Sequence, residues 1–217
     1  AHRAWVTQYR KDVAAAEEAG EEAPAFSWND SPLGDFIPKF QAAAEEYAGS
    51  DDAIPFLLWI GMDVAWLDAD AGKAAIETLC TTHVKSEALE PLGRALGGLP
   101  DVVGEERAAE LLAMIEAQST VPSLVGRAVF ARVLPLLEKA EMGTDAYNKA
   151  KAELTAAAES SKDSRLQSEV SKKLRIREAF GIGMVAPDIQ GTDLDGTAFN
   201  LSDYKGKIIF VDFWGDW

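Results

Sequence analysis

Residues 208–213 read Ile-Ile-Phe-Val-Asp-Phe, an apolar run that only Asp212 interrupts. A continuous apolar run of this length is typical of a β-strand that is buried on both faces of a sheet. An acid inside such a strand is costly unless it is paired, hydrated or protonated. We therefore expect a central strand over residues 208–213, with Asp212 as a group suited to moving protons.

The organisation of the chain changes near Gly181. Before it, apolar residues recur at helical spacing, and after it, alternating residues and turn residues take over. We predict a helical domain over residues 1–182 and a β segment over residues 183–217. Within the latter, Asp193-Leu-Asp-Gly196 resembles the start of a calcium loop, but the later ligands and the closing glutamate are missing. A hairpin turn is the better interpretation.

The β segment also carries an ordered series of motifs. They are Gly183, Ala186-Pro187-Asp188, Asp195-Gly196, Phe199, Leu201-Ser202-Asp203-Tyr204, Gly206-Lys207 and Val211-Asp212-Phe213-Trp214-Gly215-Asp216-Trp217. This series resembles the opening of redoxin proteins of the TlpA and ResA type, within the thioredoxin superfamily. The resemblance implies that residues 183–217 form the N-terminal hairpin and first central strand of an incomplete thioredoxin-like domain.

The resemblance also implies a chemistry. In that family the tryptophan at the place of Trp217 directly precedes Cys-x-x-Cys at a helix N-terminus, where the dipole lowers the pKa of the first thiol. By position, Asp212 resembles the acid that relays the proton of the second cysteine. Trp214 resembles a packing residue beneath the site, and Trp217 resembles the aromatic that shields the dithiol.

These expectations define a function for the parent protein. It is expected to be a thiol-disulfide oxidoreductase without a cofactor, acting on a protein disulfide or dithiol client and located outside the cytoplasm. This chain ends at Trp217 and has one cysteine, Cys80. Alone, it is expected to lack the redox-active cysteines and to be inactive.

The helical part predicts a mainly α fold, either a multi-helix bundle or a short αα array of tetratricopeptide or HEAT type. Apolar stripes over residues 40–47, 54–67, 76–83 and 105–115 mark four of about eight helices. Cys80 and His83 approach each other on one helix, but no third group is evident, so core packing is preferred to catalysis. The alternative function is a non-enzymatic protein–protein interaction domain.

Composition narrows the partners. The chain has a net charge of −15, which disfavours nucleic acid, and two histidines and one cysteine give no metal cluster. The most apolar stretch, residues 54–67, is too short to span a membrane and contains Asp63.

The basic residues of the last helix, Arg165 among them, are interpreted as structural. Ala1 in place of methionine suggests that an upstream segment was removed, and strand 208–213 could pair with another copy of the chain.

Overall fold

The computed structural model describes residues 2–25, 27, 31–181, 184–185 and 187–212. Two compact units make up the chain, a helical unit of residues 1–170 and a C-terminal unit of residues 171–217. The division falls within the last helix, whereas the sequence suggests a boundary after residue 182. That boundary stays a prediction.

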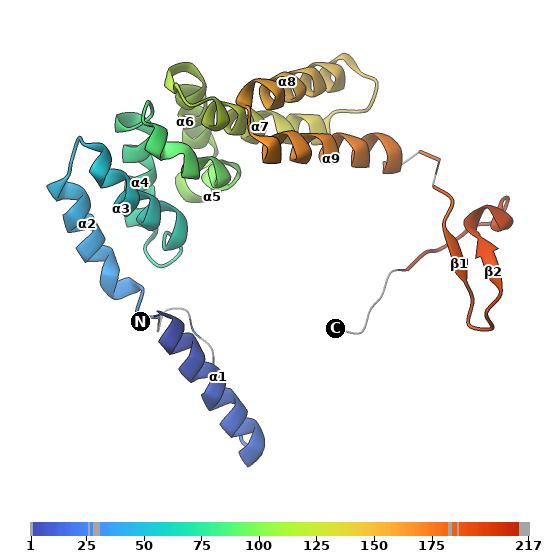
Figure 1. The fold of residues 1–217 in the computed structure, drawn as a ribbon, viewed down its shortest axis with the longest axis horizontal. Helices are drawn as coiled ribbons and strands as arrows, with labels where there is room; N and C mark the ends of the chain where they lie inside the picture. Colours follow the sequence, from blue (N-terminus) through green and yellow to red (C-terminus); the bar gives the residue numbers. More distant parts are fainter. Residues whose placement is uncertain (1, 26, 28–30, 182–183, 186, 213–217) are drawn as a thin grey trace. The chain divides into compact units, whose positions relative to one another are not determined.

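Helices dominate the chain, as the sequence predicts (Figure 1). The α-helices are α1 (His2–Ala19), α2 (Ile37–Glu46), α3 (Ile54–Leu58), α4 (Ala69–Thr82), α5 (Leu99–Val103), α6 (Glu105–Gln118), α7 (Pro122–Lys139), α8 (Asp145–Ser161) and α9 (Ser164–Phe180). Short 3-10 turns connect several of them, namely η2 (Gly34–Phe36), η3 (Asp51–Ala53), η5 (Glu87–Arg94) and η6 (Leu96–Gly98).

Local sequence explains where several helices begin. The side chain of Asp68 accepts a hydrogen bond from the Ala71 amide at α4, and Thr144 accepts one from the Tyr147 amide at α8. Such caps satisfy amides that have no partner inside the helix. Ser86 caps η5 in the same way, and this element is a 3-10 helix rather than an α-helix. Pro91 lies inside it, and proline removes one of the amides that an α-helix needs.

The core of the helical unit is aliphatic. Fully buried leucines and isoleucines come from consecutive elements, among them Ile54, Ile76, Leu89, Leu111 and Leu124. Packing links α2 with α3, α3 with α4, α4 with α6, α6 with α7 and α7 with α8. The helices therefore stabilise one another mainly through neighbours in the sequence.

One element departs from the expected helix over residues 54–67. After α3 the backbone widens into a π-helix, η4 (Trp59–Asp63). Gly61 lies there against Ile76 of α4, so closely that an added Cβ would be 2.9 Å from Ile76 Cδ1. The wider turn coincides with this close approach between two helices.

The C-terminal unit contains a short antiparallel hairpin. Strands β1 (Gln190–Thr192) and β2 (Ala198–Asn200) pair with Gly191 opposite Phe199, and η7 (Leu201–Tyr204) follows. Asp193 Oδ1 accepts hydrogen bonds from the amides of Asp195 and Thr197 at 3.0 and 2.8 Å. Gly196 adopts a positive φ of 81°. The prediction of a hairpin turn at Asp193–Gly196 is confirmed.

The expected central strand is not formed over residues 208–212. These residues have no strand pairing, and Ile208 and Phe210 are almost fully exposed, at 104% and 91%. The physical reason is that a strand exists only through hydrogen bonds to a neighbour, and β1 and β2 already pair with each other. Phe213, Trp214 and Trp217 lie outside the described residues.

Candidate functional site

The residues predicted to carry redox chemistry are not gathered into one site in the described part of the chain. Asp212 is exposed and lies in an irregular segment. It therefore lacks the buried environment that the sequence suggested for a proton relay. Trp214 and Trp217 cannot be placed relative to it, since they lie outside the described residues.

The hairpin that precedes Asp212 is held by its own polar contacts. The Asp188 carboxylate accepts hydrogen bonds from the Ser202 amide at 2.8 Å and from the Ser202 hydroxyl at 2.9 Å. Asn200 and Asp203 form a capping box at the start of η7. The motif residues of this segment therefore serve a local fold, consistent with the N-terminal hairpin that the sequence predicts.

Cys80 and His83 form no nucleophile and base pair. Cys80 is fully buried in the core, and this burial raises the pKa of its thiol to about 12, with the Glu77 carboxylate adding to the effect. A thiolate, which is the reactive form, is therefore scarce at neutral pH. His83 is buried as well, with its Nδ1 atom 3.6 Å from Asp51 Oδ1. Core packing of Cys80, the simpler alternative, agrees with the structure.

A groove on the helical unit is the more developed candidate for a binding site. It has a volume of about 800 Å³ and lies between η5, the first turns of α7 and the junction of α8 with α9. We call it the α7–α9 groove and define it by Glu90, Arg94, Ser123, Arg127 and residues 161–165. All of these residues belong to the helical unit.

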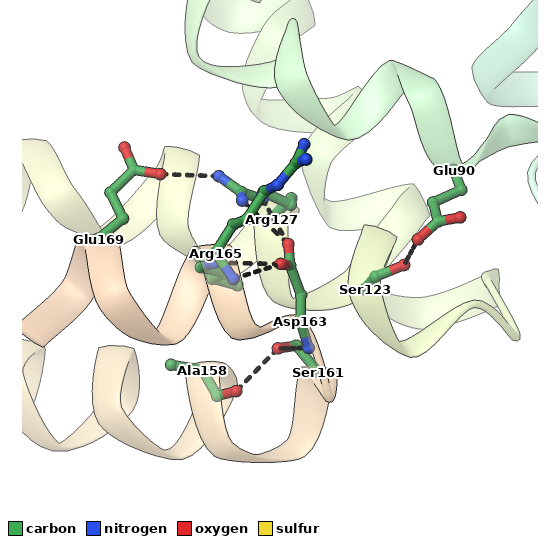
Figure 2. Close-up of polar contacts among 9 residues, drawn as sticks. Glu90, Ser123, Arg127, Ala158, Ser161, Asp163, Arg165 and Glu169 are labelled. Carbon is green, nitrogen blue, oxygen red and sulfur yellow. Dashed lines mark hydrogen bonds and ion pairs between the residues drawn. The ribbon is translucent and has the colours of Figure 1, made fainter.

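Arg127 lines the groove and is held by two acids (Figure 2). Its guanidinium lies 2.9 Å from Asp163 Oδ2 and 2.8 Å from Glu169 Oε2. Only 16% of the Arg127 side chain is exposed. Its aliphatic stem passes Gly93, where an added Cβ would be 3.1 Å from Arg127 Cγ. The guanidinium is therefore fixed both by packing and by charge.

Asp163 uses its whole carboxylate within the protein. Its Oδ1 atom caps α9 by accepting hydrogen bonds from the amides of Arg165 and Leu166, while its Oδ2 atom faces Arg127. Burial alone would raise the pKa of Asp163, but the Leu166 amide and Arg127 outweigh it, and the pKa lies below its usual value. Asp163 is therefore ionised at neutral pH.

In the groove, the acidic side chains have hydrogen-bond or ion-pair partners, whereas three of the basic side chains have no acidic partner among the described residues. Its acids are engaged, since Asp163 and Glu169 contact Arg127 and Glu90 accepts a hydrogen bond from the Ser123 hydroxyl at 3.0 Å. Arg94, Lys162 and Arg165 are exposed on its rim, and the described residues provide no acidic partner for them. Figure 2 shows the Arg165 guanidinium without any contact drawn to it. The groove thus presents cations on a strongly acidic chain.

This site is not predicted by the sequence patterns. Arg165 was interpreted as a structural residue of the last helix, and no role was predicted for Arg127. A signal was available, since Arg127 interrupts the apolar run from Leu124 to Leu137 and a buried cation needs an acidic partner. Its partners lie 36 and 42 positions away, a separation that periodicity does not reveal.

Two general findings apply to the described residues. None of their helices is both long enough and apolar enough to cross a membrane. They also contain no group of three or more His, Cys, Asp or Glu side chains arranged to hold a metal ion.

Comparison with known proteins gives a partial match. Thiol-disulfide oxidoreductase ResA of Geobacillus kaustophilus (strain HTA426) is 49% identical over 41 residues, which are 19% of this chain and 24% of that protein. The ResA proteins of Geobacillus thermodenitrificans (strain NG80-2) and Bacillus thuringiensis subsp. konkukian (strain 97-27) are 44% and 48% identical over 41 and 40 residues, respectively. They are covered to 24% and 23% of their length, by 19% and 18% of this chain.

The match is limited in extent. The chain spans about a quarter of the length of these curated relatives. No family model matches the chain, and no solved structure matches it. Within these limits, about a fifth of the chain is related in sequence to thiol-disulfide oxidoreductases of the ResA type.

Proposed function

We propose that this chain is part of a thiol-disulfide oxidoreductase and that residues 183–217 open its thioredoxin-like domain. The observation that carries the proposal is the 49% identity to ResA over 41 residues. The hairpin Gln190–Asn200 supports it, because the resemblance implies a hairpin ahead of the first central strand. We assign the matched stretch to this segment because the ordered motifs lie there.

The proposed reaction is thiol–disulfide exchange. A cysteine thiolate attacks one sulfur of a client disulfide and releases the other sulfur as a thiolate that takes up a proton. A second cysteine of the enzyme then breaks the mixed disulfide, so the client is reduced and the enzyme is oxidised. The resemblance places this cysteine pair directly after Trp217.

Asp212, Trp214 and Trp217 have supporting roles in this proposal. Asp212 takes the proton of the second cysteine, Trp214 packs beneath the dithiol, and Trp217 shields it. For Asp212 to act in this way, residues 208–213 must become a buried strand. The exposed apolar side chains of Ile208 and Phe210 would be buried in the same step.

The client and the location follow from the same analogy. We propose a protein disulfide or dithiol as the client and a site of action outside the cytoplasm, where disulfides persist. Both depend on the relationship to ResA.

The decisive experiment is to sequence the gene beyond the codon for Trp217 and to assay the full encoded protein. We expect Cys-x-x-Cys to follow, and we expect the protein to accelerate the reduction of insulin disulfides by dithiothreitol. An Asp212→Asn variant should slow this reaction and change its pH profile, whereas Asp195→Asn in the hairpin turn serves as a matched control. A stop codon after Trp217, or full-length protein without reductase activity, would refute the proposal.

A second candidate function concerns the helical unit, which we propose as a protein-interaction domain. Two concave surfaces favour this function. One is the α7–α9 groove, and the other is a groove of about 450 Å³ between α2, α3 and α4, which is lined by several alanines. Interaction domains bind their ligands in such concave surfaces. If the helical unit recruits clients, its deletion should slow reduction of a protein client but not of a small aromatic disulfide.

A further inference from the structure

We propose that the α7–α9 groove binds an acidic peptide segment of a partner protein. This inference rests on the second proposed function, a protein-interaction domain, and names its ligand class; it does not depend on the redox function. It begins with the charge balance of the groove, which differs from that of the whole chain. The chain carries a net charge of −15, yet the groove has four cations, Arg94, Arg127, Lys162 and Arg165, against three acids, Glu90, Asp163 and Glu169.

The acids of the groove leave it a small positive excess, which lies on its rim. Asp163 and Glu169 are bound to Arg127, and Glu90 is engaged by Ser123. The Arg127 side chain is thus held in place and its charge is compensated by acids of the protein. Arg94, Lys162 and Arg165 remain exposed. Carboxylates of a ligand are the complementary groups for these cations, because ionised hydrogen bonds are the stronger ones.

Lys162 adds a structural argument. It lies at the C-cap of α8 in the left-handed conformation, with φ 56° and ψ 12°. Glycine adopts this conformation with less strain, and no other described non-glycine residue has a positive φ. The lysine therefore keeps an ammonium group on the rim at some conformational cost.

The size of the groove identifies the class of ligand. A volume of about 800 Å³ is far larger than a single inorganic anion needs and lies within the range of sites for larger ligands. Three separate cations on its rim can be satisfied together by several carboxylates. A peptide with acidic residues spaced along it meets both conditions.

The test uses fluorescence anisotropy with two labelled probes, the hexapeptides (Glu-Leu)3 and (Gln-Leu)3. We expect the acidic probe to bind the chain and the neutral probe to bind at least tenfold more weakly. Binding of the acidic probe should weaken as salt is raised from 50 to 500 mM, since exposed charges are screened.

The informative variant is Arg165→Glu. Residue 165 lies in the first turn of α9, where a carboxylate complements the helix dipole, which offsets its repulsion from Glu169 one turn along, so we expect the variant to keep the fold of the parent chain. Its affinity for (Glu-Leu)3 should nevertheless fall about tenfold. Lys149→Glu on α8 makes the same change in net charge outside the groove and should leave the affinity within twofold.

Three results would overturn the proposal. They are equal binding of the two probes, equal losses in Arg165→Glu and Lys149→Glu, and no binding of (Glu-Leu)3 at millimolar concentration. A fourth outcome would assign the groove to a second copy of the chain, namely a dimer in light scattering that Arg165→Glu dissociates and that excludes the acidic probe.

Discussion

Gly126→Ala tests the packing that shapes the α7–α9 groove. Gly126 faces the end of α8, and an added Cβ would lie 2.6 Å from Ser161 Cβ and 3.1 Å from the Ala157 carbonyl oxygen. Neither atom is the end of a flexible side chain, so α7 and α8 must move apart. Such overpacking costs about 1–3 kcal/mol, against which alanine gains about 1 kcal/mol in helix propensity.

The free energy of unfolding should therefore fall by up to about 2 kcal/mol in Gly126→Ala. In urea denaturation followed by circular dichroism at 222 nm, this corresponds to a midpoint lower by up to roughly 1 M. Because Ser161 lines the groove, the affinity for (Glu-Leu)3 should also fall.

Gly97→Ala is the matched control for this measurement. An added Cβ at Gly97 has no neighbour within 4 Å, and its φ is not positive. This variant should be neutral or slightly more stable than the parent chain. If the two variants have the same midpoint, the close packing of α7 on α8 is not what limits stability, and the reasoning fails.

Three further predictions address other parts of the chain. The pKa of Asp163 lies below its usual value, so the stability that its ionised form contributes is present above about pH 4 and is lost as the pH falls through the folded-state pKa. In Asp163→Asn, the free energy of unfolding should therefore depend less on pH below about pH 4. An unchanged dependence would contradict this. Cys80 should react with Ellman's reagent only after unfolding, because it is fully buried, and rapid labelling of the native chain would count against that packing. Gly191→Ala should weaken the β1–β2 hairpin, since an added Cβ would lie 2.9 Å from Phe199 Cζ; the check is the loss of cross-strand nuclear Overhauser effects between β1 and β2, and their retention would show that the ring can move aside.

Local signals in the sequence predicted much of the helical unit. The apolar stripe over residues 105–115 predicted a helix, and α6 covers this stretch. Cys80 was expected to point inward, and it is fully buried. Asp193–Gly196 was expected to form a turn. In each case residues close together in sequence determine the outcome, so pattern and propensity suffice.

The remaining features depend on distant partners. The apolar run that contains Asp212 predicted a central strand, but a strand needs a neighbour, and the described residues offer none to it. Arg127 was missed for a related reason, since its role depends on acids contributed by the α8–α9 junction and by α9. Sequence patterns identify a residue that needs a partner more readily than they identify the partner.

The same arrangement of an arginine between two acids recurs twice more. Arg107 of α6 contacts Glu77 of α4 and Glu110, and Arg132 of α7 contacts Glu116 of α6 and Glu153 of α8. The interhelical pairs among these are 16 to 30 residues apart in the sequence.

This recurrence has a consequence for the order of events in folding. Contacts of short sequence separation close small loops, so each helix pair can assemble before distant parts of the chain meet. Opening should likewise be piecemeal, with some pairs of helices separating while the rest stay intact. Native-state hydrogen exchange would then show several protection levels along the helical unit, each shared by the helices that one arginine joins.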